Sequence, residues 1–353
     1  MKRIVLTGGG TAGHVTPNIA LLPALREAGF EIAYIGSYDG IEKQLITDYG
    51  IPYTGVSTGK FRRYLDIKNL TDPFRVIKGY GEAKKYLKAY KPDVVFSKGG
   101  FVSVPVVRAA ASLGIPCIIH ESDMTPGLAN KLCYGSAAKI CCNFPETVAS
   151  LPEKKAVLTG TPIRSELFTG DSEKGRELCG FKDDKPVLMV TGGSLGAMAV
   201  NQAVRDALPG LLEKYNVVHL CGKNKVDNML LTTPGYTQFE YIKDGMKDLF
   251  ALADVIISRA GANAICEILA LHKPNILIPL PSKASRGDQL LNAKSFESAG
   301  YSVVLDQDDL TSRLICDTVD SVYAERDKYI SAMKNSAQKD AVSVIVKLIK
   351  ELA

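Results

Sequence analysis

The sequence predicts an α/β fold made of two doubly wound domains, each built on a parallel sheet. Three observations support this prediction: strand-like and helix-like segments alternate, the chain contains an internal repeat, and its 353 residues suit two domains of ordinary size. Helical patterns separate most of the strand-like runs, which is typical of parallel sheets covered by helices on both faces. The short β-branched runs that we interpret as strands are residues 3–8, 31–36, 93–98, 116–121, 186–192, 216–222, 254–260 and 274–280.

A weak internal repeat links the two halves of the chain. Residues 4–25 (IVLTGGGTAGHVTPNIALLPAL) and 187–208 (VLMVTGGSLGAMAVNQAVRDAL) each combine a strand, a Gly-rich turn and a helix. We therefore expect a first domain over residues 1–163 and a second over 164–339. The last amphipathic stretch, 340–353, could belong to either domain, and we assign it to the first. Ligands bind at the carboxyl ends of the strands in such sheets, so the two Gly-rich loops are expected to face each other across a central cleft.

The composition is that of a soluble globular protein, with 46% hydrophobic and 23% charged residues. No apolar run approaches the roughly 18 residues that a membrane span requires. The first residues, MKRIVLTGGG, predict a buried strand and not a signal peptide, so we expect a cytoplasmic protein. The eight cysteines form no CxxC pair and lie apart from the four histidines. We therefore expect free thiols and no metal site.

The positive charge of the chain is concentrated in one segment. The net charge is +5, and residues 60–91 hold 10 Lys and Arg against 3 Asp and Glu, mixed with six aromatic residues. One interpretation is a solvated helix whose aromatic side chains turn inward. The other is a surface that docks on an anionic bilayer, for which nucleic acid is a weaker alternative because no RNA-binding motif is present. The residues expected to face the membrane are Phe61, Arg62, Arg63, Tyr64, Phe74, Arg75, Lys78, Lys84 and Lys85.

The first Gly-rich loop, residues 8–13, has the GxGxxG spacing of an anion-binding turn at a helix N-terminus. A nicotinamide site would also need an acidic residue at the end of the second strand, but that strand ends in Gly36-Ser37 and the first acid is Asp39. This spacing disfavours a nicotinamide cofactor and leaves a tight turn or another phosphate site. His14 follows the loop, where it could cap the helix, bind an anion or act as a general base.

The second half contains the polar groups that a nucleotide sugar requires. Ser194 lies in the second Gly-rich loop, 192–196, where a diphosphate could bind. Glu267 follows the turn SRAGANAI and could bind a ribose diol, unless it is simply a solvated helix residue. Asp288 and Gln289 begin a further helix and could contact sugar hydroxyls, although Asp288 also suits a simple helix cap.

Seven motifs together resemble the MurG family of peptidoglycan N-acetylglucosaminyltransferases. They occur in the order of the family and extend from Gly8 to Phe296, so they cover most of the chain. Each motif alone is weak evidence, but the set is highly specific. The motifs are GGGTAGHVTPNIAL, GGFVSVPVVRAA, IHESDMTPGLANK, GTPIR, TGGSLGA, SRAGANAICEI and SRGDQLLNAKSF.

The resemblance implies the GT-B fold, with two Rossmann-like domains, and inverting sugar transfer without a catalytic metal or other cofactor. The expected donor is UDP-N-acetylglucosamine (UDP-GlcNAc), and the expected acceptor is undecaprenyl-diphospho-MurNAc-pentapeptide (lipid I). The product would be lipid II, for peptidoglycan synthesis on the cytoplasmic face of the membrane. The resemblance makes other cell-wall synthesis proteins candidate partners. It implies no nucleic-acid partner.

By the same resemblance, Arg164 and Ser194 match positions that contact UDP, and Ile242 matches the one whose backbone meets the uracil. Glu267 matches the ribose-binding acid and Gln289 the residue that recognises the GlcNAc hydroxyls. The full set expected to contact the donor is Thr11, Ala12, Gly13, Arg164, Gly193, Ser194, Ile242, Gly261, Ala262, Asn263, Glu267, Asp288 and Gln289.

We expect the acceptor 4-hydroxyl to attack the anomeric carbon from the face opposite UDP, with His14 as the candidate base. Glu121 and Asp123 are reserve candidates. Some relatives carry HEQN where this chain has HESD, so an asparagine contact to the sugar does not transfer to Asp123. The acceptor diphosphate is expected at Gly10, Gly13, His14, Gly99, Gly100 and Ser103. The rival functions are a UDP-sugar epimerase, a glycosyltransferase acting on diacylglycerol and a non-catalytic UDP-sugar sensor.

Overall fold

The computed structural model describes residues 1–353 except 60–67, 194–195, 243, 284–286 and 339, and the side chains of residues 68–71 are also not described. Contacts divide the chain into two compact units. Unit 1 comprises Met1–Arg164 and Gln338–Ala353, and unit 2 comprises Ser165–Ala337.

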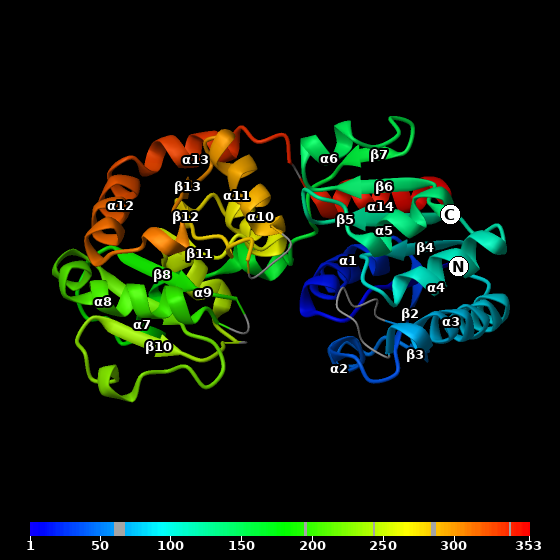
Figure 1. Ribbon diagram of the computed structural model, residues 1–353, viewed down its shortest axis with the longest axis horizontal. Helices are drawn as coiled ribbons and strands as arrows, with labels where there is room; N and C mark the ends of the chain where they lie inside the picture. Colours follow the sequence, from blue (N-terminus) through cyan, green and yellow to red (C-terminus); the bar gives the residue numbers. More distant parts are fainter. Residues whose placement is uncertain (60–67, 194–195, 243, 284–286, 339) are drawn as a thin grey trace. The chain divides into compact units, whose positions relative to one another are not determined.

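Unit 1 is built on a parallel sheet of seven strands in the order β3-β2-β1-β4-β5-β6-β7 (Figure 1). The central strands are almost wholly apolar and buried, because helices cover both faces of a parallel sheet. The strands are β1 (Lys2–Thr7), β2 (Phe30–Ser37), β3 (Tyr53–Val56), β4 (Val94–Ser97), β5 (Cys117–Glu121), β6 (Lys139–Cys142) and β7 (Ala156–Leu158).

The C-terminal helix α14 (Ala341–Leu352), drawn in red in Figure 1, belongs to unit 1. It packs against α1 (Thr16–Glu27), and its residues Ile345 and Ile349 are fully buried in the same core cluster as Leu21 and Leu25. The other helices of unit 1 are η1 (Ala12–His14), α2 (Ile41–Thr47), α3 (Lys68–Tyr90), α4 (Ser103–Ser112), α5 (Leu128–Cys133), η2 (Tyr134–Ser136) and α6 (Pro145–Ala149).

Unit 2 is built on a parallel sheet of six strands in the order β10-β9-β8-β11-β12-β13. The strands are β8 (Val187–Thr191), β9 (Asn216–Leu220), β10 (Tyr236–Phe239), β11 (Val255–Ser258), β12 (Asn275–Leu277) and β13 (Val303–Val304). The helices are η3 (Ser165–Thr169), α7 (Ser172–Cys179), α8 (Met198–Lys214), η4 (Asn228–Leu230), α9 (Met246–Leu252), α10 (Ala262–Ala270), α11 (Asp288–Ser298), η5 (Gln307–Asp309), α12 (Ser312–Ala324) and α13 (Arg326–Lys334).

The two units repeat one topology, which confirms the predicted pair of doubly wound parallel sheets. In each unit the first strand pairs with the fourth strand of that unit. An equivalent backbone hydrogen bond joins the two strands at their carboxyl ends. The N–H of Lys98, just after β4, donates to the Thr7 carbonyl at 2.9 Å, and the N–H of Arg259, just after β11, donates to the Thr191 carbonyl at 3.3 Å. The internal repeat therefore extends beyond the two Gly-rich loops to the segments Ser97–Gly100 and Ser258–Gly261.

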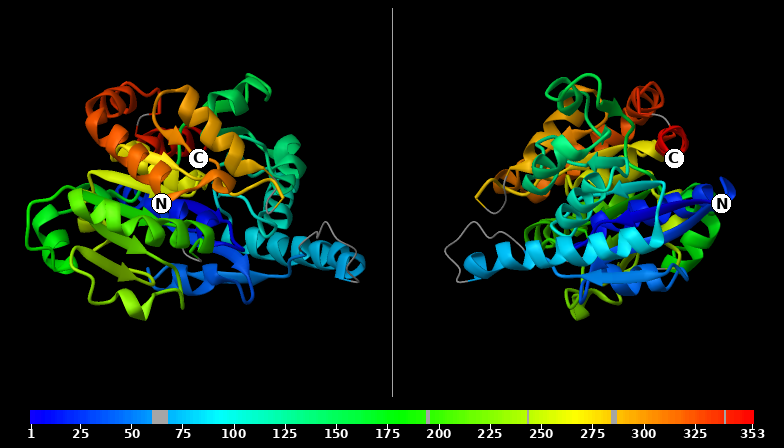
Figure 2. Two further views of the ribbon diagram at one scale, coloured as in Figure 1. Left: turned by 60° about the vertical axis from the view of Figure 1, so that its left-hand side comes forward. Right: turned by 90° about the vertical axis from the view of Figure 1, so that its right-hand side faces the viewer.

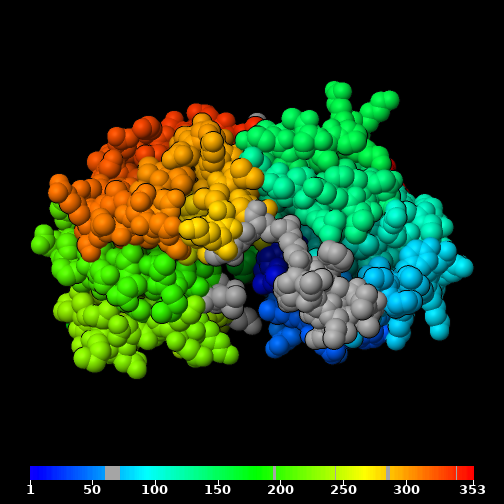
Figure 3. All heavy atoms as spheres, viewed as in Figure 1, coloured from blue at the N-terminus to red at the C-terminus, as the bar shows by residue number. Residues whose placement is uncertain are grey.

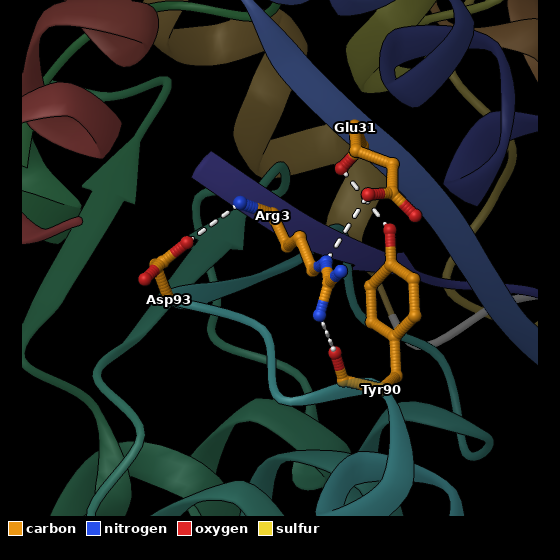
Figure 4. A network of polar contacts seen from close by, with 4 residues as sticks. All are labelled: Arg3, Glu31, Tyr90 and Asp93. Atoms are coloured by element: carbon orange, nitrogen blue, oxygen red, sulfur yellow. Dashed lines mark hydrogen bonds and ion pairs between the residues drawn. The ribbon is translucent and has the colours of Figure 1, made fainter. Parts of the chain in front are cut away.

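A polar network ties the end of α3 to the amino-terminal edge of the unit 1 sheet (Figure 4). The Arg3 Nε donates to Glu31 Oε2 at 3.1 Å, and its guanidinium also donates to the Tyr90 carbonyl at 3.0 Å. The Arg3 N–H donates to Asp93 Oδ2 at 2.6 Å. These contacts lie at the edge of the sheet opposite to the Gly-rich loop, so they fix α3 without entering the candidate site.

Candidate functional site

The first Gly-rich loop connects β1 to η1 and is held in place by buried side chains. The Tyr34 hydroxyl donates to the Gly8 carbonyl at 2.7 Å, and Asn18 Nδ2 donates to the Tyr34 oxygen at 3.1 Å. Beyond the loop, the Thr11 hydroxyl lies 3.0 Å from His14 Nδ1. His14 is half-buried and Thr11 is exposed. The pair therefore places a titratable ring, oriented by a hydroxyl, at the carboxyl end of the central strand.

The sequence analysis missed a buried acid that supports this loop. Asp39 is the first acid after β2, but the acid that contacts the loop is Glu42. It lies in the first turn of α2 and is fully buried, and its Oε2 accepts the N–H of Gly10 at 3.1 Å. Its Oε1 accepts the N–H of Ser37 at 2.9 Å and the Ser37 hydroxyl at 2.5 Å.

A second glycine turn, Gly99-Gly100, packs directly against the first. Both residues have positive φ, and a Cβ on Gly100 would overlap the Gly9 carbonyl oxygen. A Cβ on Gly99 would lie 3.6 Å from His14 Cδ2, so the ring lies beside this turn. The structure thus brings Gly99 and Gly100 next to the first loop, as expected for one shared site.

Several donors that we expected to bind the acceptor diphosphate already have partners inside unit 1. The Gly10 N–H donates to Glu42, and the Gly99 N–H donates to the Ser97 hydroxyl at 3.2 Å. The hydroxyl of the buried Ser103 donates to the Gly99 carbonyl at 2.7 Å. These three groups therefore hold the two turns together in the structure. The assignment of the acceptor diphosphate to Gly10, Gly13, His14, Gly99, Gly100 and Ser103 stays a prediction.

Lys98 is a buried cation at the carboxyl end of β4 that the sequence analysis did not single out. Its Nζ donates to His120 Nδ1 at 3.0 Å and to the Ser122 hydroxyl. The other ring nitrogen of His120 lies 2.9 Å from the Gly160 carbonyl, so Nε2 carries the proton and the ring is neutral. Burial and the positive charge of Lys98 hold the pKa of His120 well below its ordinary value.

Glu121, a reserve candidate for the base, is bonded into the loop before α5. Its carboxylate is buried and accepts the N–H of Gly127 at 3.0 Å and the Asn130 amide at 2.9 Å. Burial raises the pKa of Glu121. This environment suits a group that shapes the loop better than one that takes a proton from a ligand. Asp123, two residues on, is half-buried.

In unit 2, the second Gly-rich loop joins β8 to α8. The Gly193 N–H donates to the Thr191 hydroxyl at 3.3 Å, and the Gly196 N–H donates to the Gly193 carbonyl at 2.9 Å. Gly196 has a φ of +67°, and a Cβ there would overlap the Cys221 carbonyl. A side chain at 196 is thus excluded by the neighbouring strand. Ser194, which we expect to contact UDP, lies outside the described residues.

Two further helices begin at the same edge of the unit 2 sheet. Gly261 is the N-cap of α10, where Ala262 is buried and Asn263 half-buried. Glu267 is the sixth residue of this helix and half-buried, so it lies in the second turn and not at the helix start.

Gly287 is the N-cap of α11, and Asp288 is its first residue but does not cap it. Gln289 Oε1 accepts the N–H of Leu280 at 3.0 Å, which orients the amide and leaves its Nε2 group to donate to a ligand. Ile242 is buried, beside the exposed Tyr241.

Arg259 is a second buried cation that the sequence analysis missed. Its guanidinium donates to the carbonyls of Ile278 and Pro279, each at 3.0 Å, and to Gln307 Oε1 at 2.5 Å. These partners are neutral, and burial lowers the pKa of Arg259. A cation held by neutral groups two residues before the N-cap of α10 adds positive potential where an anion is expected. The signal in the sequence was the match of S-R-A-G to S-K-G-G in the first half.

Arg164, which we expect to contact UDP, is half-buried and is the last residue of unit 1.

The basic segment forms α3, whose aromatic residues divide into two sets. Phe74, with Ile77 beside it, is exposed (73% and 67%), whereas Tyr80, Tyr86 and Tyr90 pack against the core of unit 1. The tyrosines of this helix therefore turn inward, as the first interpretation expects, and the docking interpretation stays a prediction for the exposed part.

The first part of α3 carries exposed cations beside its exposed apolar residues. Arg75, Lys78 and Lys85 are exposed, and Lys84 is half-buried over the Tyr80 ring at 5.5 Å. Figure 2 shows α3 as one long helix whose N-terminal end projects from unit 1, and in Figure 3 it forms part of the surface in cyan. Phe61, Arg62, Arg63 and Tyr64 lie outside the described residues.

Among the residues that the structure describes, no group of three or more His, Cys, Asp or Glu side chains could hold a metal ion. No helix within the same residues combines the length and the apolar character that a bilayer span requires.

Models of glycosyltransferase family 28 match both halves of the chain. The N-terminal domain model matches residues 4–142, and the C-terminal domain model matches residues 187–349.

Curated proteins resemble the chain over its whole length. It is 63% identical over 351 residues to the UDP-N-acetylglucosamine–N-acetylmuramyl-(pentapeptide) pyrophosphoryl-undecaprenol N-acetylglucosamine transferase of Lachnospira eligens, with 99% of each chain covered. It is also 63% identical over 352 residues to the protein of the same name from Lachnoclostridium phytofermentans, covering 100% of this chain and 99% of that one.

Solved structures also match the chain over nearly its whole length. The crystal structure of Acinetobacter baumannii MurG matches with a TM-score of 0.79 and 27% identity, covering 99% of this chain and 100% of that one. The UDP-GlcNAc 2-epimerase of Neisseria meningitidis matches with a TM-score of 0.69 over 99% of this chain and 100% of that one, but at 13% identity it shares only the fold.

Proposed function

This chain belongs to the MurG family of N-acetylglucosaminyltransferases, within glycosyltransferase family 28, and we propose from this that it converts lipid I to lipid II. It transfers N-acetylglucosamine from UDP-GlcNAc to undecaprenyl-diphospho-MurNAc-pentapeptide in peptidoglycan synthesis. The observation that carries this conclusion is the 63% identity to transferases of this name along 99% of both chains. The bond is formed to the 4-hydroxyl of MurNAc with inversion at the anomeric carbon, and UDP leaves.

The donor is assigned to unit 2. The N-termini of α8, α10 and α11 lie at the carboxyl edge of its sheet, where backbone N–H groups favour a diphosphate, and α10 and α11 each follow a glycine N-cap. Arg259 and Arg164 add positive charge that favours UDP as it leaves. Glu267 would bind the ribose and the Nε2 group of Gln289 a GlcNAc hydroxyl. The remaining assigned contacts are Thr11, Ala12, Gly13, Gly193, Ser194, Ile242, Gly261, Ala262, Asn263 and Asp288.

The acceptor is assigned to unit 1, with His14 as the base for the attacking hydroxyl. Nδ1 of His14 lies against the Thr11 hydroxyl, so the proton would be taken by Nε2. This requires the tautomer in which Nδ1–H donates to Thr11, because only then does Nε2 keep its lone pair. Asp123 remains a reserve candidate, while the hydrogen bonds of Glu121 support a structural role.

We assign the exposed part of α3 to an anionic membrane surface. Phe74 and Ile77 lie one helical turn apart, and Arg75 and Lys78 flank them, so apolar and cationic side chains are exposed together. An enzyme whose acceptor carries an undecaprenyl chain needs such a contact. This would make the protein peripheral, on the cytoplasmic face of the membrane.

Radiolabelled transfer tests the function directly. Incubation of the full-length protein with UDP-[14C]GlcNAc and lipid I should yield labelled lipid II, and UDP-glucose in place of UDP-GlcNAc should yield far less product. UDP-GlcNAc alone should not yield UDP-ManNAc, which is the product of the rival epimerase. Absence of labelled lipid II from folded protein that binds UDP would refute the proposal. A calorimetric titration should show that Glu267→Ala weakens UDP binding, and an unchanged affinity would remove the ribose role.

A further inference from the structure

Three glycines from three segments surround the carboxylate of Glu42. A Cβ on Gly9, in the first loop, would lie 2.5 Å from Glu42 Oε1. A Cβ on Gly40 would overlap both carboxylate oxygens, whereas one on Gly36, at the end of β2, would meet the Tyr53 hydroxyl first and lie 2.8 Å from Glu42 Cγ. Neither Gly9 nor Gly40 has a positive φ, so the backbone alone would accept a side chain at both positions. The glycines are required there because the carboxylate fills the space.

The carboxylate also takes up donors that a ligand anion would otherwise use. Its oxygens accept two backbone N–H groups, those of Gly10 and Ser37, together with the Ser37 hydroxyl. The Ser37 carbonyl in turn accepts the Tyr53 hydroxyl at 2.5 Å. Glu42 is fully buried, so this interaction is not weakened by exposure to solvent. The first Gly-rich loop thus contains an anion supplied by the protein itself.

The second Gly-rich loop is built differently. In the described part of this loop no carboxylate accepts a glycine N–H: that of Gly193 goes to the Thr191 hydroxyl and that of Gly196 to a backbone carbonyl. A cation is adjacent instead, since Lys225 Nζ donates to the Gly196 carbonyl at 3.2 Å. The described part of the second loop therefore lacks the carboxylate that the first loop holds, which favours a nucleoside diphosphate at the second loop.

We propose that Glu42 is a positioning residue for acceptor use in the transfer reaction: its carboxylate fixes the first Gly-rich loop and so the Thr11–His14 turn. The inference rests on the proposed function. The chain of contacts runs from Glu42 to Gly10, one residue before Thr11, whose hydroxyl orients the His14 ring. Gly9 is packed against Gly100 on its other side, so a shift of the loop also moves the second glycine turn.

Two substitutions test the role of the carboxylate, one at Glu42 itself and one at the neighbouring Gly40. Glu42→Gln is nearly isosteric, but its NH2 group must face one of the N–H donors that the carboxylate now satisfies. Gly40→Ala leaves the first loop untouched and only forces the Glu42 carboxylate from its place. For both variants we expect the kcat/KM for a soluble lipid I analogue to fall about 10- to 100-fold, since displacements near 1 Å have effects of this size. The Kd for UDP, assigned to unit 2, should stay at the wild-type value.

A double mutant isolates the interaction from any general loss of stability. Once Glu42→Ala has removed the carboxylate, Gly40→Ala meets no clash and should cost nothing further. Glu31→Gln, at an exposed position on β2, is the matched control for loss of a carboxylate and should keep wild-type kcat and KM. Purely structural destabilisation would lower the fraction of folded protein and the melting temperature, but would leave the acceptor KM unchanged.

The outcomes separate this inference from the proposed function. If wild-type protein makes no lipid II, the proposed function is wrong, whatever the variants do. If the wild type is active and the folded Glu42→Gln and Gly40→Ala variants keep its acceptor kcat and KM, Glu42 has no positioning role. Additive losses in the double mutant would also overturn the inference, because they would show that Gly40 acts independently of the carboxylate.

Discussion

Replacing His219 should flatten the dependence of stability on pH. His219 lies on β9, is fully buried, and has a polar partner on each ring nitrogen. Asn201 uses its Nδ2 to donate to the Cys221 carbonyl, so its Oδ1 must accept the Nε2–H of His219, at 3.1 Å. Nδ1 therefore accepts the Tyr236 hydroxyl, at 2.9 Å, and the folded protein holds the ring neutral.

The size of the effect follows from the pKa of this ring. Burial, with the nearby charge of Arg205, lowers the pKa of His219 from 6.5 to about 3. Between these values the unfolded chain binds a proton that the folded protein does not, so stability falls as the pH falls below 6.5. At 1.36 kcal/mol per pH unit, lowering the pH from about 7.5 to about 5 should cost about 2 kcal/mol of unfolding free energy from this residue alone.

Urea denaturation measures this loss. The chain has no tryptophan, so unfolding is best followed by far-UV circular dichroism, at about pH 7.5 and about pH 5. His219→Gln will lower stability at both pH values, but the variant should lose about 2 kcal/mol less than the wild type on acidification. His120, which is also buried and neutral, remains in both proteins and contributes equally. Equal losses in the two proteins would refute the assignment of a neutral, buried His219.

Three further predictions concern the site and the membrane surface. Thr11→Val removes the hydroxyl beside His14 Nδ1 and should lower kcat about tenfold, the value of one hydrogen bond, whereas Thr11→Ser should retain the rate. Equal rates for the two variants in the soluble lipid I assay would contradict the proposed orientation of His14. Gly196→Ala places a Cβ against the Cys221 carbonyl in a left-handed conformation, which should cost about 1–3 kcal/mol and abolish UDP binding measured by calorimetry. Gly135→Ala, where a Cβ would meet nothing, is its control, and intact UDP binding in Gly196→Ala would show that the loop adapts. Replacing both Phe74 and Ile77 by Ser should weaken partition onto anionic vesicles about 100-fold, because about 3 kcal/mol of apolar burial is lost. Turnover of the soluble acceptor should not change, and wild-type vesicle binding by this variant would exclude α3 from the membrane contact.

The sequence by itself was sufficient for the fold class and for most of the central strands. Runs such as Ile4–Leu6 and Val187–Val190 are buried on both faces, so their apolar character is continuous and visible without any knowledge of their neighbours. The strands that we did not predict are β3, β6, β7, β10 and β13, which have two to four residues. Such segments are too short to show a period, and pairing with the adjacent strand stabilises them.

In the candidate site, too, some residues could be predicted from the sequence and others could not. The two Gly-rich loops and His14 were found because a glycine pattern before a helix is a local signal. Glu42, by contrast, lies 32 residues from Gly10, with which it forms a hydrogen bond, and Lys98 lies 22 residues from His120. No pattern within one segment predicts such partners, because the folding of the sheet brings them together.

The glycines of the first loop show the difference between the two kinds of information most clearly. The sequence determined that residues 8–13 form a tight turn at the start of a helix. It could not determine why Gly9 and Gly40 must both lack a side chain. Only the tertiary structure decided this, because the folding of β2 and α2 beside β1 places the Glu42 carboxylate in the space between them.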